Sequence, residues 1–185
     1  MRWMSAKLVW LAVPLVWIAC KREKKDGSED VGHPPVSTIE VRLIQGGDTI
    51  RGRYKDPDGP GGRPATIDTL RPRAGETYTY LLRILDETGN PTHDLSELIF
   101  GQQKNTHRMY FFPDPENLAT IEPSDVDDLG RPVGGRGTWR QGPASVSEGS
   151  VRFLLRHYIN PSDKNFGLER GSTDLDVSLP VRIQN

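Results

Sequence analysis

The chain has 185 residues and a formal net charge of −1, with 24 lysines and arginines against 25 aspartates and glutamates. This balance argues against a nucleic-acid-binding protein, which needs a basic surface. The single cysteine excludes a disulfide scaffold and a cysteine-rich zinc module. With 19 glycines and 15 prolines, the composition favours one turn-rich β domain over a helical bundle.

The first nineteen residues have the pattern of a signal peptide. Arg2 and Lys7 give a positively charged start, and residues 8–19 form an uncharged, mostly apolar run. As a helix this run would be about 18 Å long, too short for a bilayer core of about 30 Å. A cleaved secretory leader over residues 1–19 fits this pattern better than a membrane span.

Residues 16–20, Val-Trp-Ile-Ala-Cys, resemble the lipobox of bacterial lipoproteins. The resemblance implies cleavage before Cys20 and attachment of acyl chains, such as palmitate, to that cysteine. The alternative for Cys20 is an ordinary buried thiol. Residues 21–36 are highly charged, contain two prolines and have almost nothing to bury. We therefore expect residues 20–36 to be a lipidated, disordered tether and residues 37–185 to be the folded domain.

Alternating apolar and polar residues dominate the domain and predict half-buried strands. The clearest runs are residues 38–43, 77–84, 151–158 and 174–183, and weaker ones cover 49–54, 66–70, 107–112, 118–122 and 137–141. Pro180 cannot donate a hydrogen bond within a sheet, so its strand is expected at an edge or at a bulge.

One helix is predicted over residues 95–104. Asp94 would be its N-cap, Glu97 would be the capping-box partner, and Leu95, Leu98 and Ile99 would form the buried stripe. With eight or nine short strands, the predicted fold is all-β with one short helix. We expect an antiparallel β-sandwich of the immunoglobulin or transthyretin type.

Two acidic turns are candidate calcium sites. Asp56 and Asp58 alternate before Gly59, but the next alternate position is Pro60, which offers no side-chain oxygen. A second cluster, Asp125, Asp127 and Asp128, precedes Gly130. In both places the competing interpretation is a turn in which aspartate and proline fix the backbone.

His93, His107 and His157 are the candidate ligands for a divalent transition metal. Their spacing contains no metal-binding motif. A helix between His93 and His107 would let the two approach each other, and His157 has the apolar parity of its strand. The competing interpretation is that these are half-buried histidines with ordinary hydrogen-bond partners.

Tyr110, Phe111 and Phe112 are consecutive on a predicted strand, so their side chains point to both faces. Packing in the core is the default for such residues. An exposed member of the group would be a candidate partner-binding aromatic.

Several motifs together resemble a family of small lipoproteins from Bacteroidetes-type bacteria, often named type one periplasmic binding fold superfamily proteins. The resemblance covers most of the chain after Cys20 and implies no established activity. It is carried by the lipobox, the charged tether, the Tyr-Lys-Asp-Pro-Asp-Gly turn at 54–59, Ile-Asp-Thr-Leu at 67–70, Asn-Pro at 90–91, His107 with the aromatics that follow it, Leu-Arg-His at 155–157 and Thr-Asp-Leu-Asp-Val at 173–177. The family name implies two α/β lobes and a chain about twice as long, whereas the alternation predicts a β-sandwich.

The sequence predicts a lipid-anchored, non-catalytic binding module of the outer membrane that captures a small ligand or a metal. The alternative is an accessory protein that docks on an outer-membrane receptor or transporter through its sheet edges or aromatics. An enzyme is the third hypothesis, because no catalytic motif is found. No cofactor is required. The basic stretch at residues 21–25 differs from an acidic surface-export signal, so a periplasmic and a cell-surface location both stay open.

Overall fold

The computed structural model describes residues 34–59 and 61–184 and contains ten strands in this part of the chain. They are β1 (Thr38–Gln45), β2 (Asp48–Lys55), β3 (Thr66–Ile67), β4 (Thr77–Asp86), β5 (His93–Asp94), β6 (His107–Asp114), β7 (Ala119–Pro123), β8 (Arg136–Gln141), β9 (Glu148–His157) and β10 (Ser172–Arg182). The leader, Cys20 and most of the expected tether lie outside the described residues. In the described part, no helix has the length and apolar character needed to cross a membrane.

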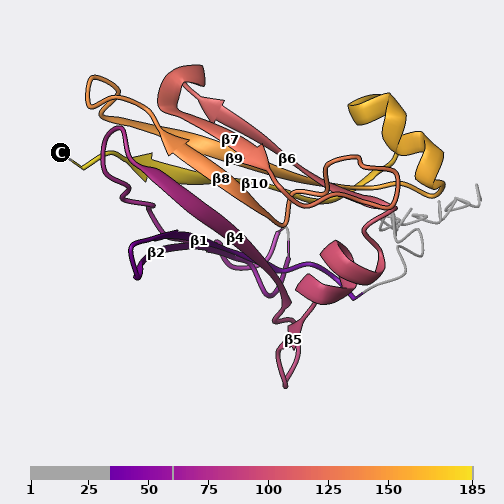
Figure 1. Ribbon diagram of the computed structural model, residues 1–185. Coiled ribbons are helices and arrows are strands. Elements are labelled where there is room, and N and C mark those ends of the chain that lie inside the picture. The colour runs from indigo at the N-terminus through magenta and orange to yellow at the C-terminus, as the bar shows by residue number, and fades with distance from the viewer. Residues whose placement is uncertain (1–33, 60, 185) are drawn as a thin grey trace, which may run out of the picture.

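The strands form two antiparallel sheets, which confirms the predicted β-sandwich (Figure 1). The larger sheet has the order β3-β2-β1-β4-β8-β7, with β5 paired to the end of β4. The smaller sheet has the order β10-β9-β6. Each of the nine predicted runs contains a strand, although the run at 66–70 gives only the two-residue β3, and the one strand not predicted is the two-residue β5.

The apolar residues of the alternating runs face one another between the sheets. Every second residue of β1 is fully buried, and the same holds for the central part of β9. The fully buried side chains include Ile39, Val41, Leu43, Tyr80, Ile84, Trp139, Val151, Phe153, Leu155 and Leu179. This continuous core explains how the domain folds without a disulfide.

Pro180 lies in β10, at the edge of the smaller sheet, as predicted. The register between β9 and β10 also shifts between Thr173 and Leu175, so this strand has a bulge as well. The carbonyl of Pro180 accepts a hydrogen bond from Leu70 N, at 2.9 Å. The segment around Leu70 therefore covers part of this edge, which limits its pairing with other chains.

The helical elements differ from the prediction. Instead of an α-helix over residues 95–104, the chain forms one short π-helical turn, η1 (Leu98–Gln102). Asp94 is not the N-cap of this turn, which is Glu97, but its Oδ1 accepts hydrogen bonds from N and Oγ of Ser96 just before it. Leu95 and Ile99 are buried as expected. No side-chain cap from Glu97 is found at the turn.

Two further helical segments were not predicted. The 3-10 turn η2 (Glu116–Leu118) leads into β7, and η3 (Pro161–Glu169) lies between β9 and β10. The η3 segment is kinked at Gly167, whose φ of 58° favours glycine. Its polar composition has no amphipathic pattern, but Pro161 at its start and Asp163 in its first turn are signals of a helix N-terminus.

Candidate functional site

The first acidic turn does not gather its carboxylates around a common point. The Asp58 carboxylate accepts a hydrogen bond from Arg63 N at 2.8 Å and contacts the Arg63 side chain at 3.5 Å. The Asp56 carboxylate instead lies 3.5 Å from the Tyr54 hydroxyl. Over residues 34–59 and 61–184, no group of three histidine, cysteine, aspartate or glutamate side chains has an arrangement that could hold a metal ion. The geometry therefore favours the structural turn over a calcium site.

The three aspartates of the second acidic cluster have separate structural partners. Asp125 accepts hydrogen bonds from the backbone N–H groups of Gly134 and Gly135. Asp128 forms an ion pair with Lys104 and a hydrogen bond with Asn105. Asp127 points to the interior, where it forms ion pairs with Arg131 and Lys164. These carboxylates fix loops to the sandwich and do not converge on an ion.

The structure brings His107 and His157 together but does not add His93 to them. His93 lies in β5 on the larger sheet, where it pairs with Asp86 and is exposed. His107 and His157 are directly opposite in the smaller sheet, and their rings stack with centroids 4.7 Å apart. The metal site expected from His93, His107 and His157 is thus not supported by the described residues.

The two stacked histidines close one end of the core. His107 is fully buried, and its Nε2 lies 3.4 Å from Oδ2 of Asp174, which is also buried. On the other side of the ring, Nδ1 lies 3.1 Å from the carbonyl oxygen of Gln103. The bulge between Thr173 and Leu175 displaces the β10 register at this point. The half-buried histidine expected at position 157 is confirmed, and His107 is too buried for a substrate to reach it.

The aromatic group at 110–112 is divided between the core and the surface. Phe111 packs edge-on against Tyr80 and Phe153, with ring centroids 5.3 and 5.6 Å away. The Tyr110 hydroxyl lies 2.8 Å from the Tyr158 hydroxyl. Only Phe112 is exposed, and the Arg152 guanidinium lies 5.5 Å from the centre of its ring. A continuous aromatic surface for a partner is therefore absent here.

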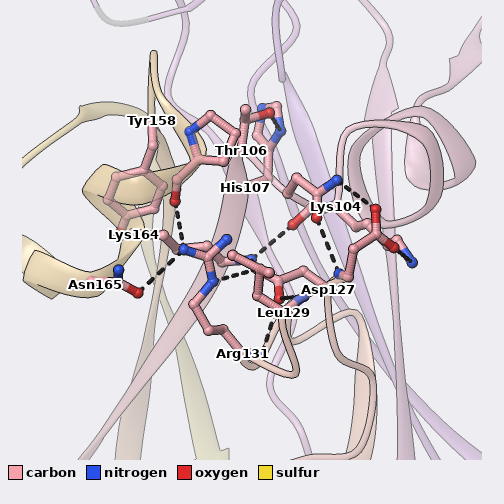
Figure 2. Close-up of polar contacts among 12 residues, drawn as sticks. Lys104, Thr106, His107, Asp127, Leu129, Arg131, Tyr158, Lys164 and Asn165 are labelled. Atoms are coloured by element: carbon pink, nitrogen blue, oxygen red, sulfur yellow. Dashed lines mark hydrogen bonds and ion pairs between the residues drawn. The ribbon is translucent and has the colours of Figure 1, made fainter.

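A buried ion-pair cluster joins η3 to the loop before β8 (Figure 2). The Lys164 ammonium donates to the Lys104 carbonyl at 2.7 Å and to Oδ2 of Asp127 at 3.0 Å, and the Lys164 side chain is not exposed. Arg131 contacts the same carboxylate oxygen at 2.8 Å and also donates to the Pro161 carbonyl. A lysine can be buried this completely only if its ammonium group has such partners. Sequence reasoning missed Lys164, because it lies in a polar segment that resembles a loop.

The protonation of this cluster follows from its contacts. Burial alone would raise the pKa of Asp127, but hydrogen bonds from the Arg131 and Leu129 N–H groups and from the Lys164 and Arg131 side chains lower it to about 2. Burial lowers the pKa of Lys164, and the Asp127 carboxylate opposes that shift. Burial also raises the pKa of the Tyr158 hydroxyl, next to η3. The cluster is an internal brace, because the Asp127 carboxylate binds both Lys164 and Arg131 and these two side chains also donate to backbone carbonyls of other segments.

The candidate binding site is a pocket of about 510 Å³ between η1 and the start of β8. This is within the range of small-molecule sites, about 300–1,000 Å³. Its apolar walls come from Leu81, Leu82 and Phe100. A Cβ on Gly135 would lie 2.6 Å from the Phe100 ring, so the absence of a side chain at that position lets Phe100 lie against β8.

Charged groups of both signs line this pocket. Two of its carboxylates already have partners, because Asp94 pairs with Arg83 at 2.7 Å and Asp125 accepts the backbone bonds given above. Glu97 and Arg136 also line it. Within the described part of the chain, the side chains of Glu97 and Arg136 have no hydrogen bond or ion pair, so one anion and one cation are available to a ligand. Of these pocket residues, the sequence singled out only three: Asp94 and Glu97 as helix caps, and Asp125 as part of an acidic turn.

Comparisons with models of protein families, with curated proteins and with solved structures find no significant match. The resemblance to the lipoprotein family and the likeness to immunoglobulin or transthyretin topology therefore stay predictions.

Proposed function

We propose that this protein is a lipid-anchored, non-catalytic binding module of the outer membrane, and that the pocket between η1 and β8 holds its ligand. The observation that carries the proposal is the combination of apolar walls with an available carboxylate on Glu97 and an available guanidinium on Arg136. Cys20, at the end of the expected leader, supplies the anchor. The hypothesis that the protein captures a metal ion is not part of the proposal.

The chemistry of the pocket favours a small zwitterion with an apolar body, such as an amino acid with an aliphatic side chain. An ammonium group would pair with Glu97 and a carboxylate with Arg136, which can form a bidentate contact. The aliphatic body would lie against Leu82 and Phe100. Each charged contact is worth about 1.5–3 kcal/mol, so the loss of one predicts a roughly tenfold or greater weakening of binding.

Calorimetric titration of the protein with L-leucine tests this proposal. We expect binding of leucine, and at least about tenfold weaker binding of leucine amide and of N-acetyl-leucine, which each lack one charge. Glu97→Gln and Arg136→Gln should weaken binding similarly. Arg140→Gln is the matched control, since Arg140 lies on β8 but pairs with Glu122, away from the pocket. Equal heats for all variants would contradict a site at this position.

The accessory-protein alternative has one supporting observation. The strand β6 forms an edge of the smaller sheet, where backbone groups of an edge strand can pair with a strand of a partner. A photo-crosslinking residue in place of Phe112, which is exposed on β6, would test it in membranes. A specific adduct with one membrane protein would favour docking, and adducts with none would count against it.

A further inference from the structure

The exposed apolar side chains are concentrated in two segments. The described part of the chain has eight large hydrophobic side chains classed as exposed, and five of them lie at positions 126–129 and 159–168. They are Val126, Leu129, Ile159, Phe166 and Leu168, which we call the apolar tip. Ile159 is 74% exposed and Leu129 is 71% exposed. A local group of this kind is typical of a surface that contacts a protein or a membrane.

The buried ion-pair cluster holds the two segments of the apolar tip together. Lys164 in η3 pairs with Asp127, and Arg131 reaches from the loop to the Pro161 carbonyl and to Oδ1 of Asn165 (Figure 2). These bonds join residues that are 30 to 37 positions apart in the sequence. These bonds fix the two segments against each other. The apolar side chains of the tip therefore stay exposed and do not move into the core.

The tip also lies at the end of the sandwich where the described chain begins. Figure 1 shows η3 and the start of β1 at the same end. Ser37 N donates to the Leu85 carbonyl, which places the N-terminal entry beside the end of β4. Cys20 precedes Pro34 by fourteen residues, a reach of at most about 50 Å when extended. A lipid on Cys20 would therefore tether the domain to the bilayer from this end.

The charges beside the tip are paired. Arg170 forms an ion pair with Asp163 at 3.0 Å, and its guanidinium lies 4.4 Å from the centre of the Phe166 ring. In the brace, Lys164 and Arg131 both pair with the Asp127 carboxylate, which leaves one positive charge in excess. Pairing lowers the cost of bringing these groups close to an apolar medium. Arginine beside an aromatic ring is also suited to the headgroup level of a membrane.

We propose that the apolar tip docks on the lipid bilayer that holds the Cys20 anchor, so that the domain lies against the membrane in one orientation. This inference depends on the lipid anchor of the proposed function. The apolar side chains enter the headgroup region, as in other interfacial segments. A second copy of the chain and a protein partner are the competing occupants of the surface.

Fluorescence quenching in vesicles tests the docking. The full chain, matured in a bacterial host, is reconstituted into phosphatidylethanolamine–phosphatidylglycerol vesicles that contain a lipid-bound quencher. Because the chain has a single cysteine, which the lipid would block, a new cysteine can be labelled with a polarity-sensitive dye. The labelled variants are Leu129→Cys and Leu168→Cys, with Thr49→Cys in the exposed β2 strand as the control at the opposite end.

We expect quenching and a blue shift of the dye at positions 129 and 168, and neither change at position 49. The combined change Ile159→Ser and Phe166→Ser should abolish quenching at position 129, while flotation with the vesicles stays unchanged. Flotation without quenching at the tip overturns the docking but leaves the anchor intact. Loss of flotation overturns the anchor and the docking together. A concentration-dependent blue shift in detergent alone identifies a second copy as the occupant and also overturns the docking.

Discussion

The ammonium of Lys164 lies 3.0 Å from Oδ2 of Asp127, and neither side chain is exposed to solvent. The pair connects η3 to the loop before β8, two segments that are 37 residues apart in the sequence. Removing one partner of a buried pair leaves the other charge uncompensated, which costs about 3–5 kcal/mol. The stability of the whole end of the sandwich therefore depends on this contact.

Replacing Lys164 by methionine should lower the free energy of unfolding by about 3 kcal/mol, because Asp127 would keep only Arg131 as a charged partner. Urea unfolding followed by circular dichroism measures the change. Lys104→Met is the matched control: its ion pair with Asp128 is largely exposed, so its loss should cost about 1 kcal/mol or less. Equal effects of the two substitutions would show that Lys164 is not a brace.

The pKa of Asp127, lowered to about 2 from 3.8, predicts a pH dependence. A carboxyl group whose pKa is lowered by folding stabilises the fold above its unfolded pKa and loses that contribution as the pH falls through the folded value. About 2 kcal/mol of stability should therefore disappear between about pH 4 and pH 2. Unfolding of the wild type and of Asp127→Asn over this range measures it. If the gap between the two proteins stays constant, this assignment is wrong.

Because Phe111 packs in the core against Phe153 whereas Phe112 is exposed, alanine substitutions at Phe153 and at Phe112 should lower the stability of the fold by very different amounts. Phe153→Ala should destabilise the protein by about 3–5 kcal/mol, because Phe153 is fully buried against Phe111. Phe112→Ala removes an exposed ring and should cost less than about 1 kcal/mol. Thermal unfolding of both variants compares them directly, and a large loss with Phe112→Ala would contradict the described orientation of β6.

Attachment of acyl chains to Cys20 can be tested directly by metabolic labelling. Cells grown with radiolabelled palmitate should incorporate label into the wild-type protein and none into Cys20→Ala. The variant should also keep its leader or leave the membrane fraction, since the signal for lipid transfer is absent. Label retained by the variant would show that acylation is elsewhere or that the radioactivity is adventitious.

The alternation of residues was sufficient to predict the sandwich, because strands buried on one face have a period of two. Residues 151–157 illustrate this: Val151, Phe153 and Leu155 face the core, and His157 continues the same face. The helix at 95–104 was too long in the prediction because propensity and capping do not reveal how tightly the chain turns toward β6. The prediction did place a local hydrogen bond at Asp94, which accepts from Ser96 N, but the N-cap of the turn is Glu97.

The candidate sites were harder to predict because they depend on register and on long-range contacts. Nothing in the spacing of His107 and His157, fifty residues apart, specifies that they are opposite in the sheet. The pocket is formed by residues of β4, η1 and β8, and its shape depends on Gly135, which has no chemical signature of its own. Lys164 was overlooked because a buried lysine in a polar segment is uncommon.

Ligand capture between η1 and β8 is the central claim, and nuclear magnetic resonance of the isotope-labelled protein during a leucine titration tests it most directly. Gly101 and Gly135 line the pocket, whereas Gly46 and Gly47 form the turn between β1 and β2 and do not. The account predicts saturable shifts of the backbone amide signals of Gly101 and Gly135, with those of Gly46 and Gly47 unchanged. Unchanged signals at Gly101 and Gly135 up to millimolar leucine, or shifts confined to another part of the domain, would contradict it.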